Sequence, residues 1–298
     1  MAQQLRDIRR RIESVKSTQK ITRAMELIAS SRIIKAQQRV EAARPYAHEM
    51  RRLMASVAKN AGRIDHPLLI DRDEVRAIGS IVITSDRGLA GAYNANVIRV
   101  AERDIRGHDA DEELFLVGKK AVTYFRFRGY EFDHSWMGIS DRPSIEDARE
   151  VASAAAEAFS KGDIGEVRLA YTRYESALTQ RPVVTKLLPL PREEFEEEEE
   201  DDGRIKPQYE FEPEPEDILD VLIPRYVEGT VLQGMLESAA SEHAARRRAM
   251  KAATDNAEEL VGTLTRGYNQ ARQAEITTEI MEIVGGAEAL TAAARREG

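Results

Sequence analysis

The residues of this sequence that most readily suggest catalysis or metal binding are five histidines, His48, His66, His108, His134 and His243. Imidazoles act as general bases or metal ligands, but these lack the H-x-x-x-H or H-E-x-x-H spacing that places two of them on one helix face. No G-x-S-x-G nucleophile elbow occurs either. We therefore predict histidines that are hydrogen-bonded or on the surface, no metal site and no catalytic residue.

Glycines near two predicted strands raise the possibility of a phosphate-binding loop. Gly88 and Gly91 fit neither G-x-G-x-x-G nor G-x-x-x-x-G-K-[ST], and Gly118-Lys119-Lys120 lacks the upstream glycine and the hydroxyl residue. We expect no cofactor here, and we interpret Asp86, Gly88 and Gly91 as residues that shape a tight turn.

The composition is that of a folded chain with an uneven charge distribution. The 298 residues are 42% hydrophobic and include no cysteine, which excludes disulfides, thiol catalysis and thiol switches. No apolar run is long enough to span a membrane, and the N-terminus lacks a secretory signal. Residues 1–60 carry 14 Lys/Arg against 5 Asp/Glu, whereas residues 193–217 carry 14 acidic against 2 basic residues. A directed protein partner fits this pattern at least as well as nucleic acid.

Residues 1–60 are predicted to form a long helix with a seven-residue repeat, which Pro45 should kink or end near Arg44. Thirteen of sixteen repeat positions are apolar: Leu5, Ile8, Ile12, Val15, Gln19, Thr22, Glu26, Ala29, Ile33, Ala36, Val40, Ala43, Ala47, Met50, Met54 and Val57. The exceptions, Gln19, Thr22 and Glu26, fall together. They indicate either a polar layer that sets the helix register or a loosened segment that meets another partner.

A second long helix is predicted from about Pro224 to Leu290 within a C-terminal region of residues 218–298. Eleven of fifteen repeat positions are apolar: Leu232, Leu236, Ala239, His243, Arg246, Met250, Ala253, Ala257, Leu260, Leu264, Gly267, Ala271, Ala274, Thr278 and Met281. Each apolar stripe needs a partner, so we predict that the two terminal helices pair as an antiparallel coiled coil.

Residues 76–190 alternate between strand and helix patterns, which predicts a Rossmann-like, mostly parallel α/β domain. Strands are expected at 78–84, 113–117, 130–134, 166–174 and 182–188. Ser144 to Asp147 resembles a helix capping box. The acidic residues 191–217 are predicted to be an extended loop or insertion.

Three blocks of the sequence resemble the γ subunits of rotary F-type ATP synthases: residues 5–37, ITSDRGLAGAYN at 83–94, and residues 241–290. This resemblance implies a central rotor shaft that carries no catalytic site. Its paired terminal helices would lie on the axis of the α/β hexamer, and its α/β domain would contact the ε subunit and the membrane c-ring. Rotation of the ring would drive the β sites in turn through their conformations, so that ATP chemistry belongs to β.

The resemblance also implies which residues contact the β subunit. It places Met25 near the acidic loop of β, with Lys20, Arg23 and Arg32 as complementary charges, and it places Arg272, Gln273 and Thr277 in a second contact. An arginine fork can hold a carboxylate bidentately, and a glutamine amide both donates and accepts. The expected location is the cytoplasmic face of a bacterial plasma membrane, peripherally, without membrane insertion and without nucleic acid.

Two departures from the family remain. Ala90 stands where many relatives have cysteine, and the acidic segment 193–217 is longer and more charged than expected. We hypothesise that this segment acts as an electrostatic brake on the shaft. The alternative functions are a free-standing coiled-coil adaptor or nucleic-acid binder, and a nucleotide-binding enzyme.

Overall fold

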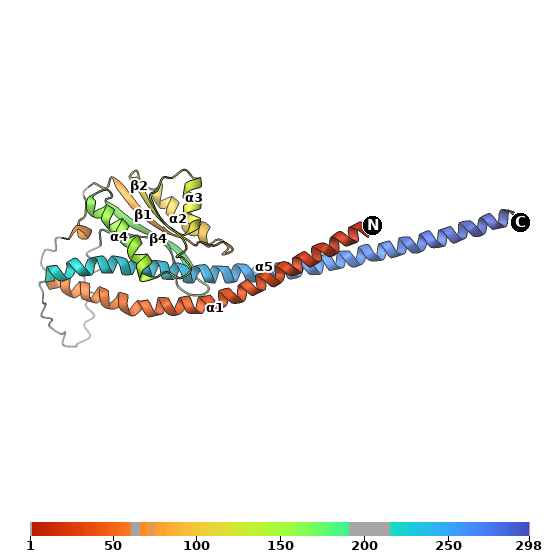
Figure 1. The fold of residues 1–298 in the computed structure, drawn as a ribbon, viewed down its shortest axis with the longest axis horizontal. Helices are drawn as coiled ribbons and strands as arrows, with labels where there is room; N and C mark the ends of the chain where they lie inside the picture. The colour runs from red at the N-terminus through yellow and green to blue at the C-terminus, as the bar shows by residue number, and fades with distance from the viewer. Residues whose placement is uncertain (1, 61–65, 73, 191–214, 298) are drawn as a thin grey trace. The chain divides into compact units, whose positions relative to one another are not determined.

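Two long helices and a five-stranded α/β domain make up the chain in the computed structural model, which describes residues 2–60, 66–72, 74–190 and 215–297 (Figure 1). These elements form two compact units. We call Met1–Ile28 with Arg248–Gly298 the two-helix unit, and Ala29–Arg247 the sheet unit. The predicted fold class, an α/β domain with paired N- and C-terminal helices, is confirmed.

Helix α1 spans Ala2–Asn60 and continues through Pro45, so it does not end near Arg44. All sixteen predicted repeat positions are buried or half-buried, and most of the residues between them are exposed. The seven-residue repeat therefore identified the contact face of α1 along its length, because a period of 3.5 residues keeps one stripe facing a neighbouring helix.

Helix α5 spans Pro215–Glu297, so it begins before the predicted start at Pro224, which lies inside the helix. One of its two predicted repeat registers is wrong beyond Ala253. Leu260, Gly267 and Ala274 are exposed, whereas the residues that follow them, Val261, Tyr268 and Glu275, are half-buried. An α-helix drifts against a strict seven-residue repeat. Because the stripe is rich in alanine, its hydrophobicity differs too little from that of the other helix faces to reveal that shift in the sequence.

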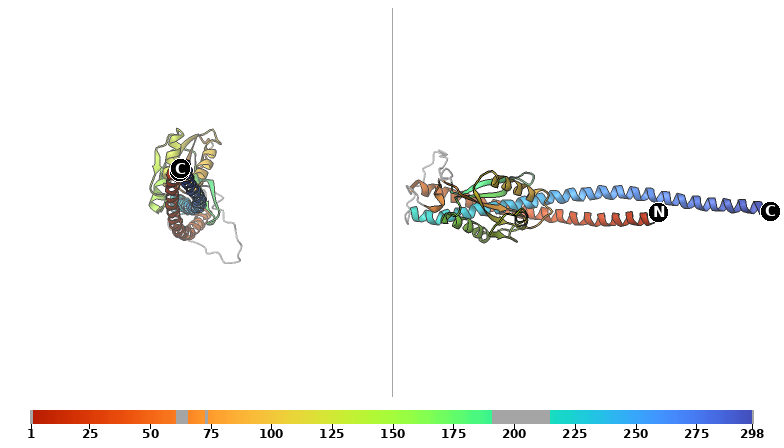
Figure 2. Two further views of the ribbon diagram at one scale, coloured as in Figure 1. Left: turned by 90° about the vertical axis from the view of Figure 1, so that its right-hand side faces the viewer. Right: turned by 90° about the horizontal axis from the view of Figure 1, so that it is seen from above.

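Within each unit, α1 and α5 run side by side in opposite directions (Figure 2). In the two-helix unit, Thr254 of α5 hydrogen-bonds to Thr22 of α1. Lys251, which precedes Thr254, lies in the electrostatic field of Glu26, which follows Thr22. In the sheet unit, Ala36 shares a cavity wall with Ala239, whereas Tyr46 lies beside Gly229. Rising numbers on α1 meet falling numbers on α5, which defines an antiparallel pair.

The sheet has the strand order β3-β2-β1-β4-β5. Its strands are β1 (Ala77–Ile83), β2 (Asp111–Val117), β3 (His134–Trp136), β4 (Glu166–Tyr174) and β5 (Gln180–Leu188). All neighbours are parallel except β4 and β5, which are antiparallel. The mostly parallel prediction is thus confirmed, although β3 begins later than the strand expected at 130–134.

Helices cover both faces of the sheet, as the continuous burial along β1 and along the last four residues of β2 requires. On one face Ile81, Phe115 and Leu169 pack with α4 (Ile145–Lys161), the short η1 (Pro67–Leu69) and the start of α5. On the other face Val82, Leu116 and Ala170 pack with α2 (Tyr93–Ile105) and α3 (Lys119–Phe127). The sheet is therefore the middle layer of three.

Two sequence predictions concern the edges of this domain. Ser144 caps α4 through the Asp147 backbone N–H, and the Asp147 side chain accepts from the Ser144 N–H, as the capping box predicted. Of the acidic segment 191–217, residues 191–214 lie outside the described residues, and 215–217 belong to α5. Across the described residues, no helix is both long and apolar enough to serve as a membrane span.

Candidate partner-contact site

Lys20, Arg23 and Met25 lie on α1 in the two-helix unit. Lys20 and Arg23 are exposed, and Met25 is half-buried. The Arg23 guanidinium is 3.6 Å from the Glu26 carboxylate one turn later, and its side chain keeps 58% of its surface open to solvent. Although Glu26 is largely buried, the 3.6 Å contact leaves most of the Arg23 side chain open, so Lys20 and Arg23 remain able to meet an acidic partner.

Next to these residues, the two helices share a polar layer in the position that the sequence indicated. The Thr254 hydroxyl donates to Thr22 Oγ1 at 2.8 Å, and the Thr22 hydroxyl donates to the Gln19 carbonyl at 3.0 Å. Thr22 and Thr254 are both buried. A bonded pair of buried hydroxyls penalises any slip of one helix along the other, which favours the register-setting interpretation.

Arg272, Gln273 and Thr277 lie on α5 in the same unit, and all three are exposed. The Thr277 hydroxyl donates to the Gln273 carbonyl at 2.9 Å, so it is engaged with its own helix. Neither the Arg272 nor the Gln273 side chain has a hydrogen bond or ion pair with another described residue. Their donors are therefore available to an external carboxylate or carbonyl.

Beyond Arg272, α5 exposes a series of large apolar side chains. Their exposed fractions are 43% for Ile276, 54% for Ile280, 68% for Met281, 71% for Ile283 and 49% for Val284. Every described side chain from 276 to 287 is exposed. Contiguous exposed apolar surface of this kind marks an interaction site, so this helix end needs a partner.

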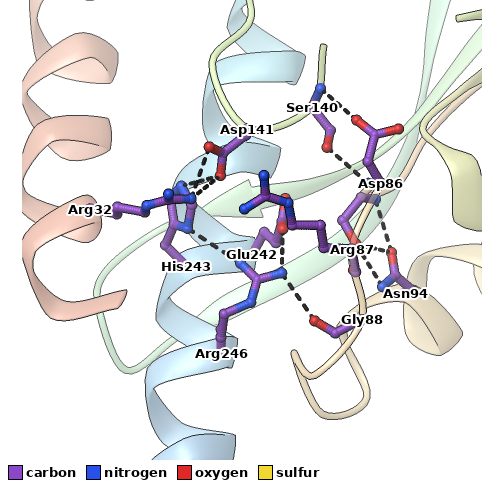
Figure 3. Close-up of polar contacts among 11 residues, drawn as sticks. Arg32, Asp86, Arg87, Gly88, Asn94, Ser140, Asp141, Glu242, His243 and Arg246 are labelled. Atoms are coloured by element: carbon purple, nitrogen blue, oxygen red, sulfur yellow. Dashed lines mark hydrogen bonds and ion pairs between the residues drawn. The ribbon is translucent and has the colours of Figure 1, made fainter. Parts of the chain in front are cut away.

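Arg32 differs from the other predicted contact residues because it is bound inside the sheet unit. Its Nη1 donates to both carboxylate oxygens of Asp141, at 2.7 and 2.9 Å. His243 Nε2 lies 3.5 Å from Asp141 Oδ1 (Figure 3). Asp141, in the loop before α4, thus joins α1 to α5.

The loop after β1 is tied to the loop that carries Asp141. Asp86 Oδ1 accepts from the Lys119 N–H at 3.0 Å and Oδ2 accepts from the Ser140 N–H at 3.1 Å, while Ser140 Oγ accepts from the Asp86 N–H at 2.9 Å. Burial opposes ionisation of Asp86, but these bonds and one from Gly138 together hold its pKa below the usual value. Asp86 therefore does more than shape a turn, because it also caps α3.

Two further ionisable groups of α5 complete this cluster. Arg246 donates to the Glu242 carboxylate at 2.6 Å and to the Gly88 carbonyl at 3.1 Å. Burial raises the pKa of Glu242 to about 7, although Arg246 opposes the rise. Burial lowers the pKa of His243 to about 4, against the opposing effect of Asp141. At neutral pH His243 is uncharged, with Nε2–H toward Asp141 and Nδ1 toward Arg246.

The cluster connects segments that lie far apart in the sequence, from α1, the loop after β1, the loop before α4 and α5. One signal in the sequence pointed to His243 and Arg246, because both are polar residues at repeat positions that are mostly apolar. Nothing local marked Asp141. Packing explains why residue 118 is a glycine, because a Cβ there would overlap the Thr84 carbonyl. Among the described residues no group of three metal-ligating side chains occurs.

Comparisons with known proteins agree with the terminal-helix architecture. A sequence model of the family described as ATP synthase matches residues 4–290. The ATP synthase gamma chain of Acidothermus cellulolyticus is 51% identical, over 98% of this chain and 99% of its own. The ATP synthase gamma chain of Cutibacterium acnes is 50% identical, with both chains fully covered.

Solved structures share the fold at low sequence identity. A chain of the Euglena gracilis mitochondrial ATP synthase, in a structure of its OSCP, F1 and c-ring, matches with a TM-score of 0.67 and 18% identity, over 98% of this chain and 96% of its own. A chain of the rotor of the same enzyme matches with a TM-score of 0.64 and 21% identity, over 93% of this chain and all of its own.

Proposed function

Since this chain belongs to the family of ATP synthase γ chains, we propose that it is the central rotor shaft of a proton-driven bacterial ATP synthase. The paired segments of α1 and α5 turn inside the hexamer of α and β subunits. The α/β domain receives torque from the membrane c-ring and contacts the ε subunit. The complex lies at the cytoplasmic face of the plasma membrane, and this chain is peripheral to the membrane.

The observation that carries this proposal is the uncovered end of α5. Ile276, Ile280 and Ile283 face solvent beside Arg272 and Gln273 in a helix of 83 residues. An exposed apolar surface of this kind marks a contact with another protein, because association removes it from water. A sleeve formed by other subunits supplies that cover, whereas a free-standing enzyme has no use for it.

The shaft needs stiffness and asymmetry, and two features support each. The polar layer of Thr22 and Thr254 fixes the register of the helix pair, and Asp141 fastens α1 to the α/β domain.

Asymmetry arises because a rotor can bias one β site over another only through differential contacts. Arg272 and Gln273 supply these on one face, with Thr277 as a weaker member, and Lys20, Arg23 and Met25 supply them on α1. Arg32 remains a proposed contact residue on α1, because 33% of its side-chain surface is exposed.

Catalysis of ATP formation belongs to the β subunits in this proposal. The chain contributes by changing the nucleotide affinity of each site in turn, which requires contacts that differ between β conformations. It uses no cofactor of its own for this role.

The test is turnover by the assembled complex with Arg272→Ala plus Gln273→Ala. We expect lower rates of ATP synthesis and hydrolysis at matched assembly, while the isolated chain keeps its helix content. The matched control is Arg266→Ala plus Asn269→Ala, which removes an arginine and an amide from the same exposed helix. Equal turnover in both double variants contradicts the assigned contact.

A further inference from the structure

A cavity of about 300 Å³ lies in the sheet unit between α1, α5 and strands β4 and β5. Residue spacing explains which side chains line it. Tyr171 and Arg173 are two apart and so lie on the same face of β4, and Tyr226, Thr230 and Gln233 have the three- and four-residue spacing of one face of α5. The cavity is within the size range of small-molecule sites, and none of the residues proposed to contact β lines it.

Three cations from three elements line this cavity: Arg51 of α1, Arg173 of β4 and Lys186 of β5. No carboxylate of the described residues forms an ion pair with Arg51 or Arg173. Lys186 has only a 3.8 Å contact to Asp71, whose side chain is 83% exposed. The Arg173 guanidinium interacts with the Tyr171 hydroxyl and lies near Glu237. Its remaining N–H groups, together with Arg51 and Lys186, are therefore available to an anion.

The acidic side chain among the described lining residues is already engaged. Glu237 is buried, and its carboxylate accepts from the Tyr174 N–H at 3.1 Å and from Gln233 Nε2 at 3.0 Å. The charge of the lining thus remains positive. Arg51, Arg173 and Lys186 are exposed, so they offer charge-assisted hydrogen bonds to an anion at the mouth of the cavity.

Aromatic side chains supply the second recognition element. Tyr46, Tyr171 and Tyr226 line the cavity; Tyr46 is 51% exposed, whereas Tyr171 and Tyr226 are buried. The open face of the Tyr46 ring offers a flat surface on which an aromatic ligand can stack. The Gln233 amide adds a group that can both donate and accept.

Gly229 keeps this space open. A Cβ at Gly229 would meet only Tyr46 Cε1, at an ordinary 3.7 Å, so packing does not require glycine there. By contrast, a Cβ at Gly234 would approach Leu169 Cδ2 to 3.1 Å. Glycine inside a helix is unfavourable, and at position 229 it leaves volume rather than relieving a clash.

We propose that this cavity binds a nucleoside polyphosphate, with the phosphates held by Arg51, Arg173 and Lys186 and the base held among the tyrosines and Gln233. The inference does not depend on the shaft role. No phosphate-binding loop is involved, so the affinity comes from side chains alone and falls at roughly 10–1,000 µM.

The experiment is calorimetric titration of the full chain with ADP, adenosine and inorganic pyrophosphate. We expect ADP to bind, and adenosine and pyrophosphate each to bind about tenfold more weakly, because each lacks one recognised part. Arg51→Gln plus Arg173→Gln weakens ADP binding by about tenfold or more.

The control is Arg52→Gln plus Arg181→Gln, which removes the same charge from neighbouring positions outside the lining; these arginines pair with Glu49 and Glu175. Gly229→Leu, which fills the cavity, abolishes ADP binding while thermal melting verifies the fold. Absence of ADP binding at millimolar concentration, equal binding of pyrophosphate and ADP, or equal loss in the control overturns the proposal.

Discussion

Asp141 receives both of its short hydrogen bonds from a single arginine, since Arg32 Nη1 lies 2.7 and 2.9 Å from its two carboxylate oxygens. This ion pair connects α1 to the loop before α4, 109 residues later in the chain. It is half-buried and also adjoins the neutral His243, which makes it a fastening between a long helix and the sheet.

Replacing Asp141 with asparagine is expected to loosen this fastening. The amide keeps the shape but loses the charge, so the free energy of unfolding should fall by about 1–2 kcal/mol. Urea denaturation followed by circular dichroism measures the change. Arg142→Gln, at the exposed next position, is the control and should change the free energy little. An unchanged urea midpoint for Asp141→Asn would show that the ion pair does not stabilise the fold.

The hydroxyl pair of Thr22 and Thr254 should show strong coupling in a double-mutant cycle. Thr→Val at either position removes the hydrogen bond between the helices but leaves the other hydroxyl bonded to a carbonyl of its own helix, so it costs about 0.5–1.5 kcal/mol, and the double replacement costs less than the sum. Chemical denaturation of the four chains gives the coupling energy. Strict additivity would show that the two hydroxyls do not interact.

The pH dependence of stability should divide between two neighbouring residues of α5. The folded pKa of His243, about 4, lies below its ordinary value of 6.5, so its stabilising contribution is complete above pH 6.5 and is lost as the pH falls toward 4. The folded pKa of Glu242, about 7, lies above 4.5, so its contribution is complete below pH 4.5 and is lost as the pH rises to 7. The two effects oppose each other.

Single replacements should therefore tilt the stability curve in opposite directions. Relative to the unmodified protein, His243→Gln removes the loss of stability on acidification, so its stability should fall more steeply, or rise less, as the pH rises from 4.5 to 7. Glu242→Gln removes the loss on alkalinisation, so its stability should rise more steeply between pH 4.5 and 7. Unfolding free energies at half-unit intervals measure both slopes, and exposed His48→Gln serves as the control. Parallel curves for the two variants would refute the assignment.

Gly229 and Gly234 should respond differently to alanine. Gly229→Ala has room for its methyl group and gains up to about 1 kcal/mol of helix stability. Gly234→Ala forces Leu169 and Ile83 to move, which offsets that gain or reverses it. Thermal melting of the two variants compares them directly. A lower melting temperature for Gly229→Ala would mean that its backbone tolerates no side chain.

The sequence predicted the fold well where local pattern and packing agree. The repeat positions of α1 and the Ser144 cap were correct, because apolar spacing and cap chemistry are local properties. The start of α5 was misplaced, because Pro224 reads as a helix boundary although tertiary packing accommodates it within the helix.

The contact cluster was only partly visible in the sequence. Arg32 was singled out for its charge, but its partner Asp141 comes from a loop far along the chain, and such a pairing depends on how the sheet and helices pack. Gln19, Thr22 and Glu26 marked a polar layer, yet only the opposing helix revealed that Thr254 completes it. The contacts of Arg272 and Gln273 stay predictions, since their partners are other chains.

Rotation of this chain within the assembled complex tests the shaft proposal most directly. The chain has no cysteine, so Phe127→Cys, at a side chain 86% exposed on α3, gives a unique attachment point for a visible probe. With the catalytic hexamer held on a surface and ATP supplied, we predict continuous rotation of the probe in one direction. A probe that stays fixed while ATP is hydrolysed at the normal rate would contradict the proposal.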